Sequence, residues 1–215
     1  LAGHVPLDGG GLSTARPVQF PGRGARLGTF QGDFLLARVS DNGPIGSPWL
    51  MAQQLVWTPA SSVAIHLRKA SMFGGDGAAR VTLGRLLGSF VGAHVQEDGQ
   101  HLPFDNQVAT VGMVVSGRGI QGGMELGMED SSGAWKRSPA LQGFLEWGPM
   151  DADGASGNTF RLERTYFSRP NGHGRWYHHS TYRGGWSERG IPLGHPLGGG
   201  GTEWRIEGRG PLAGG

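Results

Sequence analysis

The sequence contains no cysteine, so neither a disulfide bond nor a thiolate metal site can form within it. No apolar run approaches the roughly 18 residues that a membrane-spanning helix needs, which excludes an α-helical membrane protein. An excess of one charge is also missing, because 19 basic and 17 acidic residues leave a formal net charge of +2. The basic residues stand singly among acidic ones, so the composition argues against nucleic acid as a partner.

Glycine and proline are abundant instead, with 42 and 13 of 215 residues, and this density of turn formers disfavours a helix bundle. The glycines follow no three-residue period, and seven Trp, nine Phe and three Tyr accompany them, which argues against collagen and against disorder. Many short strands joined by glycine turns fit this composition. The sequence starts at Leu1 without an export signal, so we expect a mature form or a fragment whose signal lies upstream.

Apolar and polar residues alternate after a Gly-rich stretch, residues 1–26, which we interpret as a loop or tail. The clearest case is residues 118–128, where Met124 and Leu126 share one face while Glu125 lies on the other. The same period predicts about nine strands in hairpin order. They are expected at residues 27–39, 48–57, 62–70, 107–116, 118–128, 139–147, 158–167, 174–183 and 202–209.

Alternation with one charged face suits a soluble half-buried sheet as well as a transmembrane barrel. Segments of about ten residues with interleaved Trp favour the barrel, because membrane strands have that length and carry aromatic girdles at both rims. Residues 79–92 instead place apolar side chains near helical spacing, so we expect a short helix inside a long connection, residues 71–106. The predicted fold is all-β: an antiparallel up-and-down outer-membrane β-barrel, with residues 27–215 forming part of one such domain.

Three motifs invite a chemical interpretation that their context does not support. Residues 117–122 match a dinucleotide-binding glycine pattern, but strands on both sides predict a tight hairpin connection without a nucleotide. Asp151, Asp153 and Asn158 offer oxygen ligands at a spacing incomplete for a calcium loop. Three histidines near residue 178 include two neighbours that would point to opposite faces of a strand. We therefore expect no cofactor and no metal site.

Four glutamates raise the question of an enzyme. Glu125, Glu146, Glu163 and Glu207 could meet across a barrel interior as paired carboxylates do in glycosidases. Charged residues of both signs are also normal on a water-filled barrel interior, where they need no catalytic role. No nucleophile elbow or phosphate loop occurs, so we expect no catalytic residues.

Several stretches resemble capsule assembly proteins of the Wzi type, in order and at similar spacing. Met72-Phe-Gly-Gly-Asp-Gly77 is similar to that family's Phe-Gly-Gly-acidic-Gly turn, and Leu193-Gly-His-Pro-Leu-Gly198 is similar to its Leu-Gly-His-x-Leu-Gly loop. The resemblance extends from residue 27 to about residue 209. Its further segments are residues 47–59, 63–70, 105–107, 141–147 and 177–192.

The resemblance implies an outer-membrane barrel of a Gram-negative bacterium with short helices at its periplasmic end. It also implies a lectin-like, non-catalytic role in attaching capsular polysaccharide to the cell surface, with polysaccharide and outer-membrane lipid as partners and a monomeric barrel. The family barrel is larger than about nine strands permit, and the chain ends without a terminal aromatic strand. We therefore expect the downstream part of a barrel, lacking its first and last strands.

The polysaccharide contact is expected in residues 184–201, where Pro192 and Pro196 remove ladder donors and predict a loop. Aromatic faces pack on sugars and cationic groups bond hydroxyl or uronate oxygens. The candidates are Trp186, Arg189 and His195, with Arg183 at the rim. If the connection with the helix faces the periplasm, strand counting puts this loop outside.

Alternatives remain open at this point. Trp186 suits a packing or girdle role as well as sugar contact. A porin with an open lumen, a soluble β-sandwich lectin and an enzyme acting on polysaccharide are the rival functions.

Overall fold

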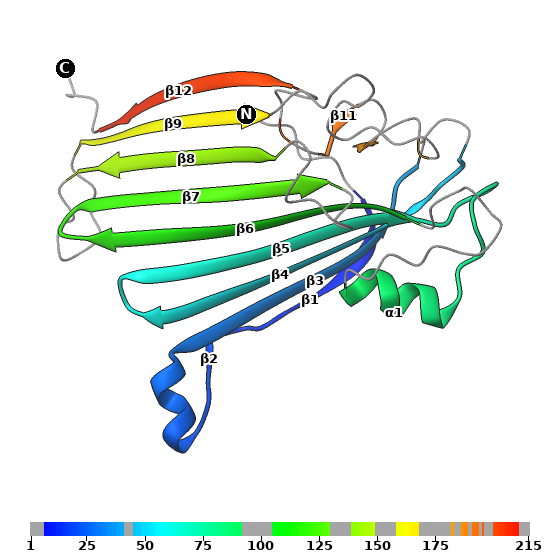
Figure 1. Ribbon diagram of the computed structural model, residues 1–215, viewed down its shortest axis with the longest axis horizontal. Coiled ribbons are helices and arrows are strands. Elements are labelled where there is room, and N and C mark those ends of the chain that lie inside the picture. Colours follow the sequence, from blue (N-terminus) through cyan, green and yellow to red (C-terminus); the bar gives the residue numbers. More distant parts are fainter. Residues whose placement is uncertain are drawn as a thin grey trace.

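The computed structural model describes residues 7–40, 45–91, 105–129, 139–148, 158–167, 182, 186–188, 191–193, 195 and 200–210. Most of these residues belong to one ten-stranded antiparallel sheet in which neighbours along the chain are neighbours in space (Figure 1). Its strands are β1 (Asp8–Ser13), β2 (Val18–Gln19), β3 (Thr29–Arg38), β4 (Trp49–Ala60), β5 (Val63–Phe73), β6 (Asp105–Gly117), β7 (Ile120–Glu129), β8 (Ala140–Trp147), β9 (Thr159–Phe167) and β12 (Gly201–Arg209).

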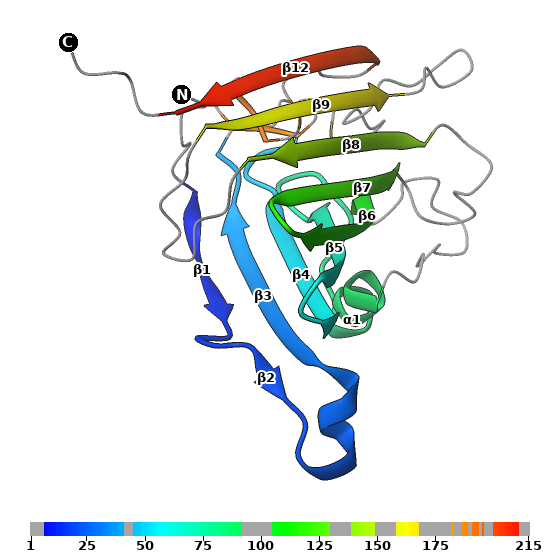
Figure 2. The same cartoon turned by 90° about the vertical axis from the view of Figure 1, so that its left-hand side faces the viewer.

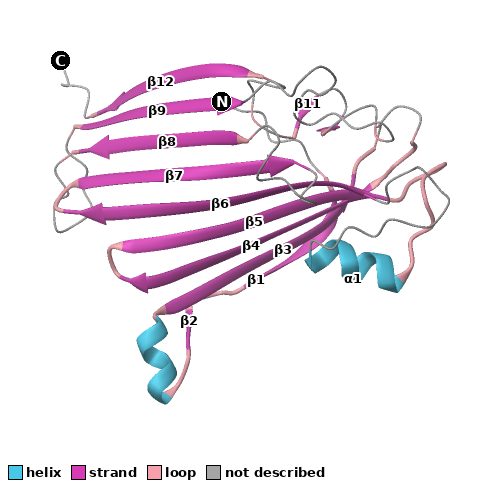
Figure 3. Cartoon of the chain, in the orientation of Figure 1, coloured by secondary structure: helices cyan, strands magenta, loops and turns pink. Residues whose placement is uncertain are grey.

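The remaining elements are small. One α-helix occurs among the described residues: α1 (Leu83–Val91) lies in the connection between β5 and β6. A six-residue 3-10 helix, η1 (Gly22–Leu27), precedes β3 (Figure 3). Strands β10 (Ser187–Glu188) and β11 (Ile191–Pro192) pair only with each other. Within the described residues, no helix is long and apolar enough to cross a membrane.

The predicted strands are present with bounds within three residues, except 174–183, of which only residue 182 is described. The strand at 118–128 is β7, and its alternation is confirmed because Met124 lies opposite Met113 while Glu125 lies opposite Gly112. Arg118 and Gly119 join β6 to β7 with φ values of 49° and 78°, the left-handed pair that a tight hairpin turn requires. The glycine motif at residues 117–122 is therefore a hairpin, as predicted.

The interpretation of residues 1–26 as a loop or tail was incomplete. β1 pairs with β3 along six residues, and β2 adds two more pairs to the same strand. Three successive glycines, residues 9–11, leave β1 without side chains that could display a period of two, although their backbone groups still pair. A Cβ added at Gly9 would collide with the carbonyl oxygen of Leu36, so this close pairing depends on glycine.

The sheet curves into a wall with two different faces (Figure 2). Helix α1 lies on the convex side and packs on the face that carries Met51 and Phe73, so the opposite face is concave. Strand register assigns each residue to one face, because residues directly opposite on neighbouring strands point the same way. The convex face is apolar and open: Leu67 is 47% exposed, Met124 69% and Ile206 79%.

The two ends of the sheet also differ. At one end, the strands are joined by the two-residue turns 61–62 and 118–119 and by residues 14–28 and 148–158. At the other end, the two longest connections, residues 74–104 and 168–200, join the strands together with residues 39–48 and 130–139. A buried cluster lies on the concave face at the long-connection end, where Tyr182 packs among strand residues. In the part of the chain that the structure describes, β1 and β12 are the two edges of the sheet and do not pair with each other.

Candidate functional site

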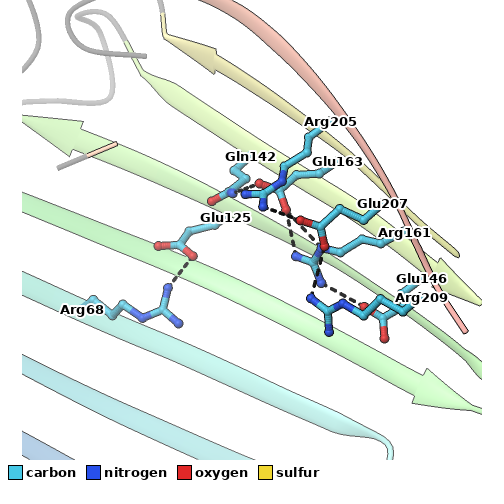
Figure 4. Close-up of polar contacts among 9 residues, drawn as sticks. All are labelled: Arg68, Glu125, Gln142, Glu146, Arg161, Glu163, Arg205, Glu207 and Arg209. Carbon is cyan, nitrogen blue, oxygen red and sulfur yellow. Dashed lines mark hydrogen bonds and ion pairs between the residues drawn. The ribbon is translucent and has the colours of Figure 1, made fainter. Parts of the chain in front are cut away.

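Charged side chains line the concave face in a network that crosses several strands (Figure 4). Arg68 on β5 reaches Glu125 on β7 at an N–O distance of 2.6 Å, passing over the intervening strand β6. The β6 residue beneath this pair is Gly112, whose added Cβ would lie 3.4 Å from the Glu125 side chain. The absence of a side chain at Gly112 therefore leaves room for the ion pair to bridge β5 and β7.

Arg161 on β9 is the centre of the network. Its guanidinium lies 3.2 Å from Glu146 on β8 and 2.9 Å from Glu163 on its own strand. It also stacks over the Phe144 ring, with 4.1 Å from the guanidinium carbon to the ring centroid. The Gln142 amide donates a 2.5 Å hydrogen bond to Glu163. Each contact uses a residue with the inward parity of β8 or β9, so alternation alone places them on one face.

The glutamates that the sequence offered as a catalytic pair are all bound to arginines. Arg68 holds Glu125, and Arg161 holds Glu146 and Glu163. On β12, Glu207 pairs with Arg205 and with Arg209. The arrangement therefore lines this face with charged hydrogen-bonding groups of both signs.

Two hollows of the concave face share the Arg68–Glu125 pair. One of about 220 Å³ lies toward β8 and β9 and includes Phe144 and Arg161 in its lining. The other, of about 480 Å³, extends toward β1 and is lined by Asp33 and Gln54 as well as by small apolar side chains. The face thus offers aromatic, cationic and amide groups side by side, which is the set that binds sugar rings and their hydroxyl or carboxylate groups.

Aromatic residues mark both ends of the convex face. Near the short turns, Phe30 stacks on Trp57 with centroids 6.0 Å apart, and Trp147 stacks on Phe160 at 5.7 Å. Near the long connections, Arg38 lies over Trp49 at 4.7 Å. Trp49 and Trp57 both lie on the convex face of β4 and are eight residues apart, or about 27 Å along the strand.

The two candidate residues that the structure describes, Trp186 and His195, lie at the long-connection end. Trp186 is 6% exposed and packs in the buried cluster with Met72 and Tyr182. The Tyr182 hydroxyl hydrogen-bonds with the backbone of Gly74, and burial raises the pKa of this hydroxyl. His195 is half-buried, with its ring 5.4 Å from Phe167 and its Nδ1 4.0 Å from Glu203.

Arg183 and Arg189 lie outside the described residues, as do Asp151, Asp153 and the three histidines near residue 178. Asn158 is described, and its side chain lies close to Gly210 at the end of β12. No group of three or more metal-ligating side chains occurs among the described residues.

The strand counting that separated Trp186 from the helix connection was wrong. β9 pairs directly with β12, so the chain leaves β9 and enters β12 at the same end of the sheet. Trp186 therefore shares its end with α1 and contacts the cluster that includes Met72 at the end of β5. The prediction had placed a further strand of the sheet between β9 and β12, and their direct pairing leaves no place for one there.

The loop predicted at residues 184–201 also differs in part. Ser187 pairs with Pro192 and Glu188 with Ile191, forming a two-residue ribbon outside the main sheet. Proline is accommodated because the ribbon is short and its strands are edges that lack further neighbours in the described chain. Leu193 closes the segment by donating its backbone N–H to the Trp186 carbonyl at 2.8 Å.

Sequence reasoning missed the arginines that organise the site. Arg161 and Glu163 share a face at a spacing of two, so their proximity was available from alternation. Arg68 and Glu125 are 57 positions apart, and only the register of three strands brings them together.

A family model described as capsule assembly protein Wzi matches residues 4–212. No curated protein matches the chain. Among solved structures, the chain is similar to one described as Wzi, an outer-membrane protein involved in group 1 capsule assembly in Escherichia coli and a carbohydrate-binding β-barrel. The identity is 16% and the TM-score 0.71, over 94% of this chain and 43% of that one. The chain thus has the fold of part of a β-barrel and spans less than half the length of its structural relative.

Proposed function

Because the chain belongs to the Wzi capsule assembly family, we propose that it forms part of an outer-membrane barrel that attaches or organises capsular polysaccharide at the cell surface without catalysis. The observation that carries this proposal is the two-faced sheet. An apolar convex face with aromatic residues at both ends suits lipid, and a concave face of arginine–glutamate pairs suits a water-filled interior. On strands tilted by about 40°, the separation of Trp49 and Trp57 spans about 21 Å across the membrane, which lies within an apolar band about 25 Å tall.

The end with the long connections faces outward in this proposal. Outer-membrane barrels have short periplasmic turns and longer extracellular loops. The turns at residues 61–62 and 118–119 then lie in the periplasm, and the segment of Trp186 lies at the outer mouth. This assignment differs from the periplasmic helices that the family resemblance implied, because connection length rather than the helix sets the direction here.

Polysaccharide binding is proposed for the outer mouth and the adjoining concave face. Arg183, Arg189 and His195 are the candidate contacts at the mouth, and buried Trp186 anchors their segment. Further inside, the hollow lined by Phe144 and Arg161 offers an aromatic face with cationic and amide groups. Such groups bind sugars without forming a covalent bond.

The buried cluster on the concave face favours polysaccharide attachment rather than an open diffusion channel. Tyr182 and Trp186 occupy the concave side at the outer end, where a diffusion channel needs free cross-section. A soluble sandwich would cover one apolar face, whereas the convex face here exposes Met124 and Ile206 over much of their surface.

Capsule retention tests the proposal. We would replace Arg189 and His195 by Ala in the producing bacterium and measure cell-bound against shed capsule, with heat-modifiable gel mobility as the check on barrel assembly. Increased shedding with normal mobility is the expected result. Unchanged retention with normal mobility would remove these two residues from the binding site, and loss of retention by the matched Ser61→Ala variant at the short-turn end would contradict a site-specific effect.

A further inference from the structure

Helix α1 exposes most of its apolar side chains and buries its polar ones. Its apolar residues are open to the surroundings: Leu83 is 73% exposed, Leu87 57% and Val91 74%. Its polar residues Arg85 and Ser89 are buried on the side that faces the sheet. A helix on the surface of a water-soluble domain shows the reverse arrangement, with its apolar stripe against the core.

The helix lies on the convex wall of the sheet rather than over its interior. Leu86 and Ala79 pack against the buried pair Met51 and Phe73. Figure 2 shows α1 on the convex side, beside the strands whose outer residues form the apolar face. The exposed stripe of α1 is therefore continuous with the face assigned to lipid above.

The helix reaches well inside the apolar band. The Gln53 amide donates a 2.7 Å hydrogen bond to the carbonyl of Phe90, and the Phe90 ring lies 6.4 Å from that of Phe34. Gln53 is four residues beyond Trp49 on β4, which places it about 13 Å along the strand from the long-connection end. The carboxyl end of α1 thus lies at a depth between those of Trp49 and Trp57.

Two polar residues interrupt the apolar convex face at this depth, and both bind the end of the helix. Lys69 donates to the carbonyl of Ser89, as Gln53 does to that of Phe90. The last carbonyls of a helix have no partner within it, and they carry the negative end of its dipole. In an apolar layer an unpaired ammonium or carbonyl is costly, so each group satisfies the other.

A groove of about 570 Å³ adjoins this contact. Its apolar lining comes from the edge strand, the convex wall and the end of the helix. These side chains are Leu12, Phe34, Leu55, Leu67 and Phe90, and polar residues, among them Asp33, Gln54 and Arg68, also line the groove. Leu12 is 77% exposed, so the groove has an open apolar rim.

We propose that α1 is embedded among the acyl chains of the outer membrane, held against the outside of the barrel by Lys69 and Gln53. The inference rests on the proposed function, because it takes the convex face as the lipid-facing one. It adds a membrane-inserted helix outside the barrel wall, whose partner is the hydrocarbon layer.

Site-directed quenching tests the embedded helix separately from the lipid-facing assignment of the convex face. The sequence has no cysteine, so Leu87→Cys, Met124→Cys and Gln121→Cys each place one bimane label within it, on α1, on the convex face and on the concave face. The protein is reconstituted in phosphatidylcholine vesicles with or without brominated acyl chains, and aqueous iodide is the second quencher. The parent protein without an introduced cysteine controls for labelling elsewhere.

The expected result is that the label at residue 87 behaves like the one at 124, with strong loss of emission from brominated lipid and little from iodide. Quenching at 87 by iodide, or by neither agent, would overturn the embedded helix, since it would be in water or covered by protein. If the label at residue 124 is quenched by iodide and not by lipid, the convex face does not contact lipid and the proposed function is wrong. That result differs from quenching by iodide at residue 87 alone, which would contradict only the embedded helix.

Discussion

Single residues of the concave face act by holding neighbouring strands together. Arg161 joins β9 to β8 through Glu146, binds Glu163 on its own strand and also covers the Phe144 ring of β8. Removal of one partner of such a network leaves the other charges unpaired, which costs more than the net value of a surface pair. Arg209 pairs with Glu207 but its side chain is 75% exposed, so water readily replaces that contact.

Arg161→Met should therefore lower the free energy of unfolding by about 1–3 kcal/mol, because Glu146 and Glu163 lose their shared cation. Urea unfolding of the folded barrel in detergent micelles measures the change. Arg209→Met is the matched control and should change stability by less than about 0.5 kcal/mol. Equal losses of unfolding free energy in the two variants would show that Arg161 stabilises the sheet no more than an exposed surface arginine does.

Trp186 and His195 should separate packing from binding. Trp186 is buried, and truncation of a buried Trp to Ala commonly costs about 3–5 kcal/mol, so Trp186→Ala should reduce the folded fraction seen by gel mobility. His195→Ala is expected to keep assembly and to weaken capsule retention. If Trp186→Ala assembles normally and sheds capsule, Trp186 itself contacts the sugar and its anchoring role is wrong.

At the scale of elements, strands with two different faces were predictable and strands without side chains were not. β7 alternates between exposed Met124 and paired Glu125, so a period of two identifies it from sequence. β1 passes through three glycines, and only the β3 backbone opposite reveals it. The end of the sheet occupied by Trp186 depended on whether residues 174–183 form a strand, and one miscounted strand reverses every later connection.

The pairing of β1 gives a matched test within one strand. A Cβ at Gly9 would strike the Leu36 carbonyl, whereas a Cβ at Gly10 meets nothing within 4 Å. Gly9→Val should therefore weaken β1 and expose it to protease, while Gly10→Val should be neutral or slightly stabilising because Val favours strands. Limited proteolysis followed by mass spectrometry locates the cuts. Similar protection in both variants would mean that the close approach at Gly9 is not required.

Lys69 and Gln53 hold α1 against the convex face through hydrogen bonds to the end of the helix. Lys69→Met removes the donor to the Ser89 carbonyl and leaves Gln53 as the remaining described partner of the helix end. In the bimane-labelled Leu87→Cys background, this change should increase iodide quenching because the helix detaches more often from the wall. Ser61→Ala in the same background controls for a general effect, and an unchanged iodide response would show that Lys69 does not hold the helix.

For the whole molecule, direction in the membrane follows from the difference between the two ends of the sheet. Arg80 is exposed in the long connection before α1, and Ser61 is exposed in the two-residue turn between β4 and β5. Because long connections face outward in outer-membrane barrels, Arg80→Cys should react on intact cells with a maleimide too large to cross the outer membrane. Ser61→Cys should react only after permeabilisation. Immunoblot mobility reports each modification. The opposite pattern would mean that the long connections face the periplasm, so the Trp186 segment could not contact surface polysaccharide.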